Sequence, residues 1–258
     1  MNFNTCLLHG NEAEHYPDGA TLVPVSQSNA FLCETIEELE RVFSHKKAGY
    51  AYSRIGNPTV AAFEQKISRL EGGIGAVATS SGMAAVSHTL LSLLTPGDEI
   101  IASGCLYGGT IGLLDDLDKL GIHTRFVPRL DPDTIQASVS ERTRCVFGEV
   151  IANPALHVMD IRAAAQAAHA AGLPLIVDST TATPFLCRPL SLGADLVIHS
   201  TSKYIPAAEM PSAAWWWTAG HFHGTVSVSL PCGDSSMPAG LPSSCGCAPT
   251  STKTWAGA

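Results

Sequence analysis

The sequence has little positive charge and no long apolar run. Its 258 residues carry 15 Lys and Arg against 23 Asp and Glu, a formal net charge of −8, which argues against nucleic-acid binding through the overall field. No apolar stretch reaches the ~18 residues that a membrane-spanning helix needs. The first residues, 1–6, show no basic segment followed by an apolar one. We therefore expect a cytoplasmic protein with no nucleic-acid or membrane partner.

The cysteines lack the spacing of a disulfide framework or a zinc site. Five of the eight stand singly within apolar segments: Cys6, Cys33, Cys105, Cys145 and Cys187. We expect these to be reduced, buried thiols. Possible metal ligands near the C-terminal end are His221, His223, Cys232, Cys245 and Cys247. These contain no CxxC pair and match no zinc pattern, so we expect no metal site.

Charged residues become scarce beyond residue 205. Residues 206–258 contain only three of them, Glu209, Asp234 and Lys253, together with all four Trp of the chain. Apart from the short run Thr225–Leu230, this tail has no helical or strand periodicity. The change in composition predicts two unlike parts, which meet near residue 205.

Helical and strand patterns alternate through the first part. Helices are indicated at 59–71, where apolar residues recur at a spacing of three or four and two glycines follow, and at the apolar-rich segment 83–94. Two further helices are indicated at 111–120 and 160–171, each ended by a glycine. Short apolar runs indicate buried strands at 74–79, 99–103, 123–127, 145–150, 173–177 and 196–199. This alternation predicts an α/β fold with a mostly parallel sheet and helices on both faces, and active-site groups at the carboxyl ends of the strands.

Three of the predicted strands are followed by residues suited to one cofactor. The turn Ser81-Gly82-Met83 opens a helix and could hold a phosphate, Asp178 ends a buried strand, and Ser200–Lys203 adds hydroxyls and a lysine. Singly, each has an ordinary alternative as a tight turn, a helix cap or a surface lysine. Together they form the set that pyridoxal phosphate (PLP) requires, with a carboxylate for the ring nitrogen and a lysine for the aldehyde.

Over roughly residues 5–205 the chain resembles the transsulfuration family of PLP enzymes. The resemblance rests on motifs that occur in the same order: Tyr52-Ser53-Arg54-Ile55-Gly56-Asn57-Pro58-Thr59, Leu70-Glu71-Gly72-Gly73, Ser81-Gly82-Met83, Leu106-Tyr107-Gly108-Gly109-Thr110, Ala152-Asn153-Pro154, Val177-Asp178-Ser179-Thr180 and His199-Ser200-Thr201-Ser202-Lys203-Tyr204. It implies the PLP-dependent transferase fold of type I. In that family a smaller C-terminal domain follows, and it supplies the arginine for the substrate carboxylate.

The resemblance implies a role for each matched site residue. Lys203 matches the lysine that forms a Schiff base with PLP, Asp178 the carboxylate beside the pyridine nitrogen, and Tyr107 the tyrosine that stacks on the ring. Further contacts to the cofactor are implied for Gly82, Met83, Asn153, Ser200 and Ser202, and, from a neighbouring subunit, for Tyr52 and Arg54. The last two imply an active site shared within a homodimer, and the usual assembly of the family is a tetramer.

Within the family, the chain looks closest to O-acetylhomoserine sulfhydrylases. The segments 147–154 and 183–189 carry this similarity. The implied reaction is γ-replacement, in which acetate leaves Cγ of the amino-acid substrate and sulfide adds there. Methionine γ-lyases, cystathionine lyases and cystathionine γ-synthases share most of the pattern and remain alternatives, as does an inactive fragment of this family.

The tail departs from the family after Ile205. Read from the third base of each codon, with G at the wobble positions of most codons, residues 206–220 become GGGNAVGGVVVDGG, which resembles the glycine-rich strand that the family has there. We hypothesise a frameshift near codons 205–206. That strand belongs between the strand at 74–79 and the one at 196–199, so its loss should leave two unpaired strand edges.

These observations divide the chain into three parts. We expect an N-terminal arm in residues 1–45, an incomplete PLP-binding domain in 46–205, and an aberrant, disordered tail in 206–258.

Overall fold

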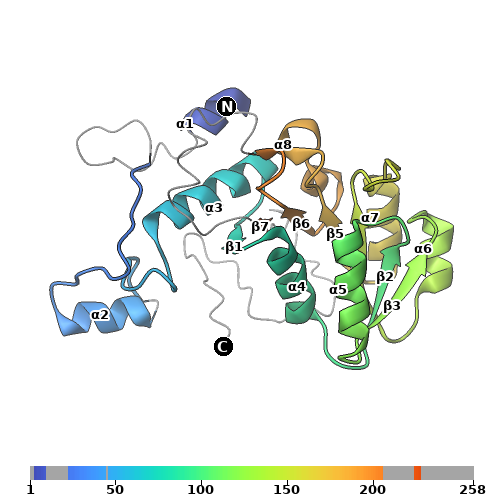
Figure 1. The fold of residues 1–258 in the computed structure, drawn as a ribbon, viewed down its shortest axis with the longest axis horizontal. Coiled ribbons are helices and arrows are strands. Elements are labelled where there is room, and N and C mark those ends of the chain that lie inside the picture. Colours follow the sequence, from blue (N-terminus) through green and yellow to red (C-terminus); the bar gives the residue numbers. More distant parts are fainter. Residues whose placement is uncertain (1–2, 10–22, 45, 206–223, 228–258) are drawn as a thin grey trace.

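A computed structural model describes residues 3–9, 23–44, 46–205 and 224–227 (Figure 1). The helices are α1 (Phe3–His9), α2 (Ile36–Phe43), α3 (Pro58–Glu71), α4 (Gly82–Leu93), α5 (Gly108–Asp118), α6 (Pro132–Ser138), α7 (Ile161–Ala170), α8 (Thr183–Leu186) and the 3₁₀ turn η2 (Pro189–Leu192). The strands are β1 (Val77–Thr79), β2 (Glu99–Ser103), β3 (His123–Val127), β4 (Thr143–Glu149), β5 (Leu175–Asp178), β6 (Leu196–His199) and β7 (Gly224–Ser227).

The strands form one sheet in the order β1-β7-β6-β5-β4-β2-β3. All neighbouring pairs from β6 to β3 are parallel, whereas β7 is antiparallel to both β1 and β6. The predicted mostly parallel α/β sheet is therefore confirmed. Because β1, β5 and β6 run in the same direction, the residues that follow them lie on the same side of the sheet, at the carboxyl ends of the strands.

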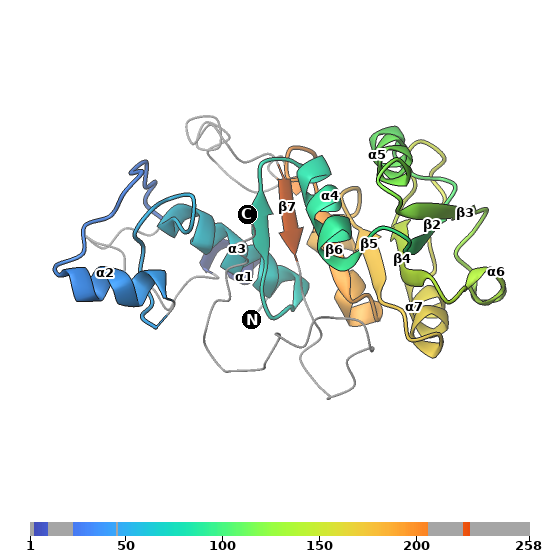
Figure 2. The ribbon, with the colours of Figure 1, turned by 90° about the horizontal axis from the view of Figure 1, so that it is seen from below.

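Helices cover both faces of the sheet, as Figure 2 shows with α4 and α5 on one side and α6 and α7 on the other. The strand side chains alternate between the two faces, as a pleated strand requires. One core contains Ile100, Ala102, Cys145, Phe147, Ile176 and Ile198, packed with residues of α4 and α5. The other contains Ile101, Val146, Val177 and Val197, packed with residues of α6 and α7. Both sets of core side chains lie within the part of the chain predicted to fold.

Local signals in the sequence set the ends of the helices. The side chain of Asn57 caps α3 by accepting a hydrogen bond from the backbone N–H of Thr59, and Gly72 ends the helix with a φ of 77°. The side chain of Ser81 caps α4 in the same way by accepting from Ala84. These caps fix where each helix begins relative to the preceding loop or strand.

The prediction of two unpaired strand edges is wrong. The slot between β1 and β6 is occupied by β7, with Val77 opposite Val226 on one side and Ile198 opposite Val226 on the other. This strand comes from the Thr225–Leu230 run, the one segment of the tail with a strand pattern. Its backbone supplies the ladder hydrogen bonds that two exposed edges would otherwise leave unmade.

Most of the tail lies outside the described residues. The hypothesis of a frameshifted segment and the possible ligands His221, His223, Cys232, Cys245 and Cys247 concern this part. Within the described ranges, no group of three or more His, Cys, Asp or Glu side chains could hold a metal ion. No helix in those ranges is both long and apolar enough to cross a membrane.

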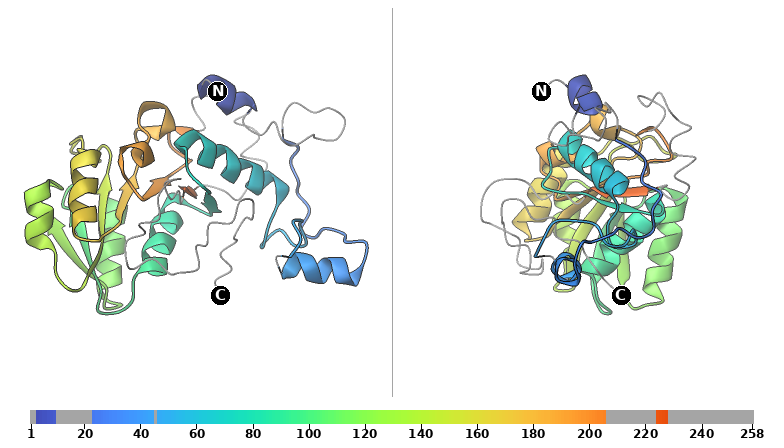
Figure 3. Two further views of the ribbon diagram at one scale, coloured as in Figure 1. Left: turned by 180° about the vertical axis from the view of Figure 1, so that it is seen from behind. Right: turned by 90° about the vertical axis from the view of Figure 1, so that its left-hand side faces the viewer.

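The N-terminal segment carries α2 at one end of the molecule, far from α6 and β3 at the other (Figure 3). This eight-residue helix buries none of its side chains. Large apolar side chains within the helix and beside it are exposed, including Ile36, Phe43 and Leu32. The segment is anchored to the following loop by a bridge between Ala30 and Tyr52.

Candidate functional site

The residues matched to phosphate binding lie where α4 begins and β6 ends. The first hydrogen bond within α4 runs from the N–H of Ala85 to the C=O of Ser81, so the amides of Gly82 and Met83 precede it and point toward any ligand at this helix end. Ser200 follows β6 and approaches Gly82 closely: a Cβ added to Gly82 would lie 2.7 Å from the Cβ of Ser200. The Oγ atoms of Ser200 and Ser202 are 3.2 Å apart, which completes a cluster of donors.

Asp178 is tied to this cluster through Thr180. The carboxylate Oδ1 of Asp178 accepts from the Thr180 N–H at 2.9 Å, and the Thr180 Oγ1 accepts from the Ser200 N–H at 2.8 Å. Burial raises the pKa of Asp178 above its ordinary value, while the Thr180 hydrogen bonds and the charge of His199 act in the opposite direction. A cation placed beside this partly desolvated carboxylate would therefore be strongly attracted.

Glu149, which the sequence reasoning missed, stands directly beside Asp178. The two residues are register partners at the ends of β4 and β5. Glu149 Oε1 accepts from the N–H of Tyr107 at 2.7 Å and Oε2 accepts from the N–H of Asn153 at 3.1 Å. Burial raises the pKa of Glu149 to about 7, and the charge of Asp178 adds to the rise while the two amides oppose it. The signal was available, because Glu149 ends an apolar strand just as Asp178 does.

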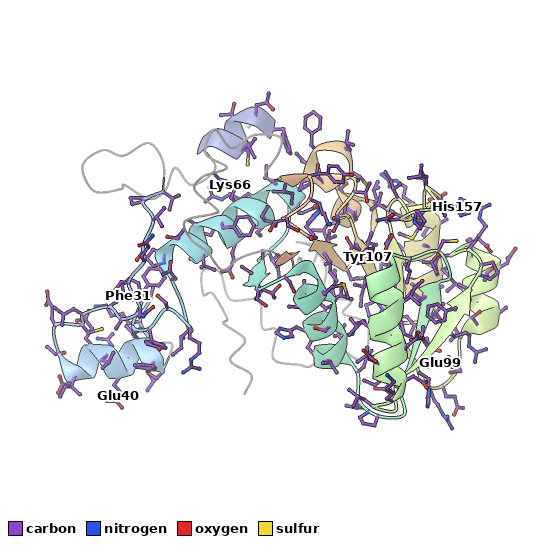
Figure 4. All side chains as sticks on the ribbon, viewed as in Figure 1. Phe31, Glu40, Lys66, Glu99, Tyr107 and His157 are labelled. Atoms are coloured by element: carbon purple, nitrogen blue, oxygen red, sulfur yellow. The ribbon has the colours of Figure 1, made fainter. Side chains whose placement is uncertain are left out.

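Tyr107 lies at the amino-terminal end of α5, as Figure 4 shows. Tyr107 is 46% exposed, so a ligand can reach it. The ring packs over the backbone of Gly109, where a Cβ would lie only 2.5 Å from the Tyr107 Cε1. Glycine at this position is therefore what allows the ring its present orientation.

Lys203 lies in the turn after β6 and is exposed. Its backbone N–H donates to the C=O of Ser200 at 3.3 Å, which keeps the lysine close to the serine cluster. The structure thus brings Gly82, Met83, Ser200, Ser202 and Lys203 together. Asp178 joins them through Thr180, and Glu149 links Tyr107 and Asn153 to the same edge of the sheet.

Tyr52 and Arg54 lie elsewhere. The guanidinium of Arg54 sits 5.7 Å from the centre of the Tyr52 ring, and the backbone of Tyr52 bridges to Ala30. Phe31 directly follows Ala30 in the sequence. Figure 4 shows Phe31 toward the left-hand end of the molecule and Tyr107 in the right half. Within one chain, therefore, this pair does not join the other predicted site residues.

The residues gathered at the carboxyl edge fit a phosphorylated pyridine cofactor. The close approach of Gly82 and Ser200 forms a cradle that any larger side chain at Gly82 would fill, and helix amides and hydroxyls suit a phosphate. Asp178 offers a carboxylate to a ring nitrogen, and Tyr107 offers an aromatic face. Lys203 offers an amine on the same edge.

Comparison with known proteins agrees with this geometry. The family model described as Cys/Met metabolism PLP-dependent enzyme matches residues 4–208. The chain belongs to this family. Its members are enzymes, and their fold of type I, with a mostly parallel sheet and helices on both faces, is the one seen here.

Individual relatives carry several activities of the family. The chain is 44% identical over 204 residues to O-acetyl-L-homoserine sulfhydrylase from Corynebacterium glutamicum, covering 78% of this chain and 47% of that protein. It is 40% identical over 198 residues to L-methionine gamma-lyase from Pseudomonas putida, covering 76% and 50%. The chain therefore spans about half the length of the relatives it matches.

Solved structures of family members share the fold. Cystathionine gamma-lyase from Lactobacillus plantarum, in complex with L-serine, superposes with a TM-score of 0.77 at 35% identity, covering 90% of this chain and 56% of that one. A Campylobacter jejuni protein described as an O-acetylhomoserine (thiol)-lyase gives a TM-score of 0.75 at 32% identity, covering 80% and 51%. That structure contains N'-pyridoxyl-lysine-5'-monophosphate.

Proposed function

We propose that this chain is the cofactor-binding part of a PLP-dependent transsulfuration enzyme that acts on O-acylhomoserine, replacing the group at Cγ with sulfide. The observation that carries the proposal is the set of connected side chains at the carboxyl ends of the strands. There Asp178, Thr180 and Ser200 are hydrogen-bonded in series, and Ser200 closes against Gly82. Family membership and the 44% identity to a sulfhydrylase support the choice of reaction.

Each residue then has a defined task in holding the cofactor. The amides of Gly82 and Met83 and the hydroxyls of Ser200 and Ser202 bind its phosphate. Asp178 would keep the ring nitrogen protonated, and the ring of Tyr107 would stack on the cofactor ring. Asn153 would lie near the ring hydroxyl. When bound, PLP supplies an electron sink that stabilises negative charge at Cα of an amino acid.

Lys203 is proposed as the residue that bonds to the cofactor and moves protons. When the cofactor and an amino acid are bound, its amine would be placed to remove protons from Cα and Cβ before acetate leaves Cγ, and to return them to the same carbons after sulfide has added there. An exposed position in a turn suits this role, because the side chain must swing between bonded and released positions. The adjoining Ser200 and Ser202 hold the backbone of this turn to the phosphate cradle.

We propose residues 46–205 as the cofactor-binding domain and the preceding arm as a contact to a second copy. The support for the contact is the helix α2, which buries no side chain, and the exposed apolar residues beside it. Tyr52 and Arg54, distant from the site of their own chain, would reach the phosphate of a partner subunit. The proposed assembly is a dimer-built tetramer.

A methionine γ-lyase is the second candidate. Its support is the 40% identity to the Pseudomonas putida enzyme. The length of the match, about half of each relative, equally supports a third reading, in which this chain alone is an inactive fragment. Assays of sulfide-dependent homocysteine formation and of 2-oxobutyrate release from methionine separate the three.

The decisive experiment is cofactor binding by the full 258-residue chain. Wild type mixed with PLP should develop the long-wavelength absorbance band of a lysine-bound cofactor. Lys203→Ala should lack that band, whereas Lys119→Ala, which removes an exposed lysine at the far end of α5, should keep it. A band of equal strength in Lys203→Ala would refute the assignment of the lysine, and its absence from wild type would refute cofactor binding by this chain.

A further inference from the structure

Two carboxylates lie side by side at the edge of the sheet where the proposed cofactor binds. Asp178 ends β5 and has a task in the proposed function, whereas Glu149 ends β4 and has none. The residues are direct neighbours in register, and Glu149 is 8% exposed. Burying a carboxylate beside another carboxylate costs folding free energy, so other interactions of Glu149 are needed to offset this cost.

The two oxygens of Glu149 hold two different loops. Oε1 accepts the backbone N–H of Tyr107, which is 42 residues away in sequence, at 2.7 Å. Oε2 accepts the backbone N–H of Asn153, four residues ahead, at 3.1 Å. One rigid carboxylate group therefore connects the turn that begins α5 to the turn that follows β4.

These two turns carry side chains that face the cofactor in the proposed function. The Tyr107 N–H belongs to the residue that precedes α5, so its hydrogen bond fixes the direction in which the helix and the tyrosine ring leave the sheet. The contact of the ring with Gly109 leaves it little freedom on one side. A shift of the Tyr107 backbone would therefore move the ring as a unit.

We propose that Glu149 is a positioning residue that sets the Tyr107 turn and the Asn153 turn relative to each other and to Asp178. The inference rests on the proposed function for the identity of the ligand, but the hydrogen bonds from the two turns to Glu149 do not depend on it. At a pH above its pKa of about 7 Glu149 is ionised, and hydrogen bonds to a charged acceptor are stronger than those between neutral groups. A carboxylate with two oxygens can accept from both amides at once, which no neutral side chain of this shape can do.

The test is Glu149→Gln in the full chain. Glutamine keeps the shape of the side chain and one oxygen acceptor, but it turns an NH₂ group toward one of the two N–H donors. The matched control is Glu99→Gln, at the other end of the sheet (Figure 4). Glu99 is also a largely buried carboxylate that accepts side-chain hydrogen bonds, from Ser140, Thr143 and Arg125.

The first measurement is hydrogen exchange without cofactor. Peptides containing the amides of Tyr107 and Asn153 should exchange about tenfold faster in Glu149→Gln than in wild type and at the wild-type rate in Glu99→Gln. Unchanged exchange at both amides in Glu149→Gln would overturn the inference, whatever the chain binds.

The second measurement is the circular dichroism induced in the absorbance band of bound PLP, normalised to the amount bound. This signal reports the orientation of the ring, which a purely structural loss of stability would not alter. We expect a changed signal and about tenfold weaker PLP binding in Glu149→Gln, with neither change in Glu99→Gln. Wild-type signal and affinity in Glu149→Gln would overturn the positioning role. If wild type itself binds no PLP, the proposed function fails. The exchange measurement alone then tests whether Glu149 holds the two turns together.

Discussion

Two helical glycines in opposite surroundings allow a sharp prediction. A Cβ at Gly82 would lie 2.7 Å from the Cβ of Ser200 and 3.2 Å from its Cα, whereas a Cβ at Gly112 would meet nothing within 4 Å. Gly82 begins α4 and Gly112 lies inside α5. The change from glycine to alanine is thus the same in chemistry and differs only in what surrounds it.

The magnitudes follow from two opposing effects. Alanine is favoured over glycine inside a helix by about 1 kcal/mol, and overpacking a close contact costs about 1–3 kcal/mol. The obstacle at Gly82 is the root of a side chain and its backbone, which cannot rotate away. We expect Gly82→Ala to lower the free energy of unfolding by about 1–2 kcal/mol and Gly112→Ala to raise it by about 1 kcal/mol.

Thermal and urea unfolding followed by far-ultraviolet circular dichroism measure both variants. The expected shifts in Tm are about 2–4 °C for each kcal/mol in a chain of this size, downward for Gly82→Ala and upward for Gly112→Ala. Gly82→Ala should also weaken phosphate binding, since the added methyl fills the cradle. A Gly82→Ala variant at least as stable as Gly112→Ala would refute the close approach on which the site depends.

Three further predictions concern buried carboxylates and the tail. Burial raises the pKa of Glu64 to about 7, so its contribution to stability is complete below its ordinary pKa and is lost as the pH rises through about 7. Glu64→Gln, which still accepts from the Ala78 N–H, should match wild type near pH 4 and exceed it near pH 8 by on the order of 3 kcal/mol in urea unfolding; a pH-independent difference would contradict this. Glu71→Ala removes the partner of the fully buried His199 and should cost about 3–5 kcal/mol, and a loss below about 1 kcal/mol would show that the pair is not formed. Coding DNA for residues 206–220 should carry G at most third positions, and any other bias would refute the frameshift.

Much of the fold could be predicted because its signals are local. The strands at Glu99–Ser103, His123–Val127 and Leu196–His199 begin and end where the apolar runs do. The helix α3 ends before a glycine with a positive φ. By contrast, α6 was missed, although Asp131 caps it and Pro132 opens it, because seven residues are too few to show a helical period.

The sequence by itself determined the alternation of strands and helices, the family, and the residue types at the strand ends, since each depends on neighbours within a few positions. Only the tertiary structure decided which distant groups meet. It placed β7 between β1 and β6 and joined Glu71 to His199 across 128 residues. It also brought the amides of two separate loops to the carboxylate of Glu149. Such contacts depend on how strands are ordered and how helices pack, and residue spacing along the chain does not encode either.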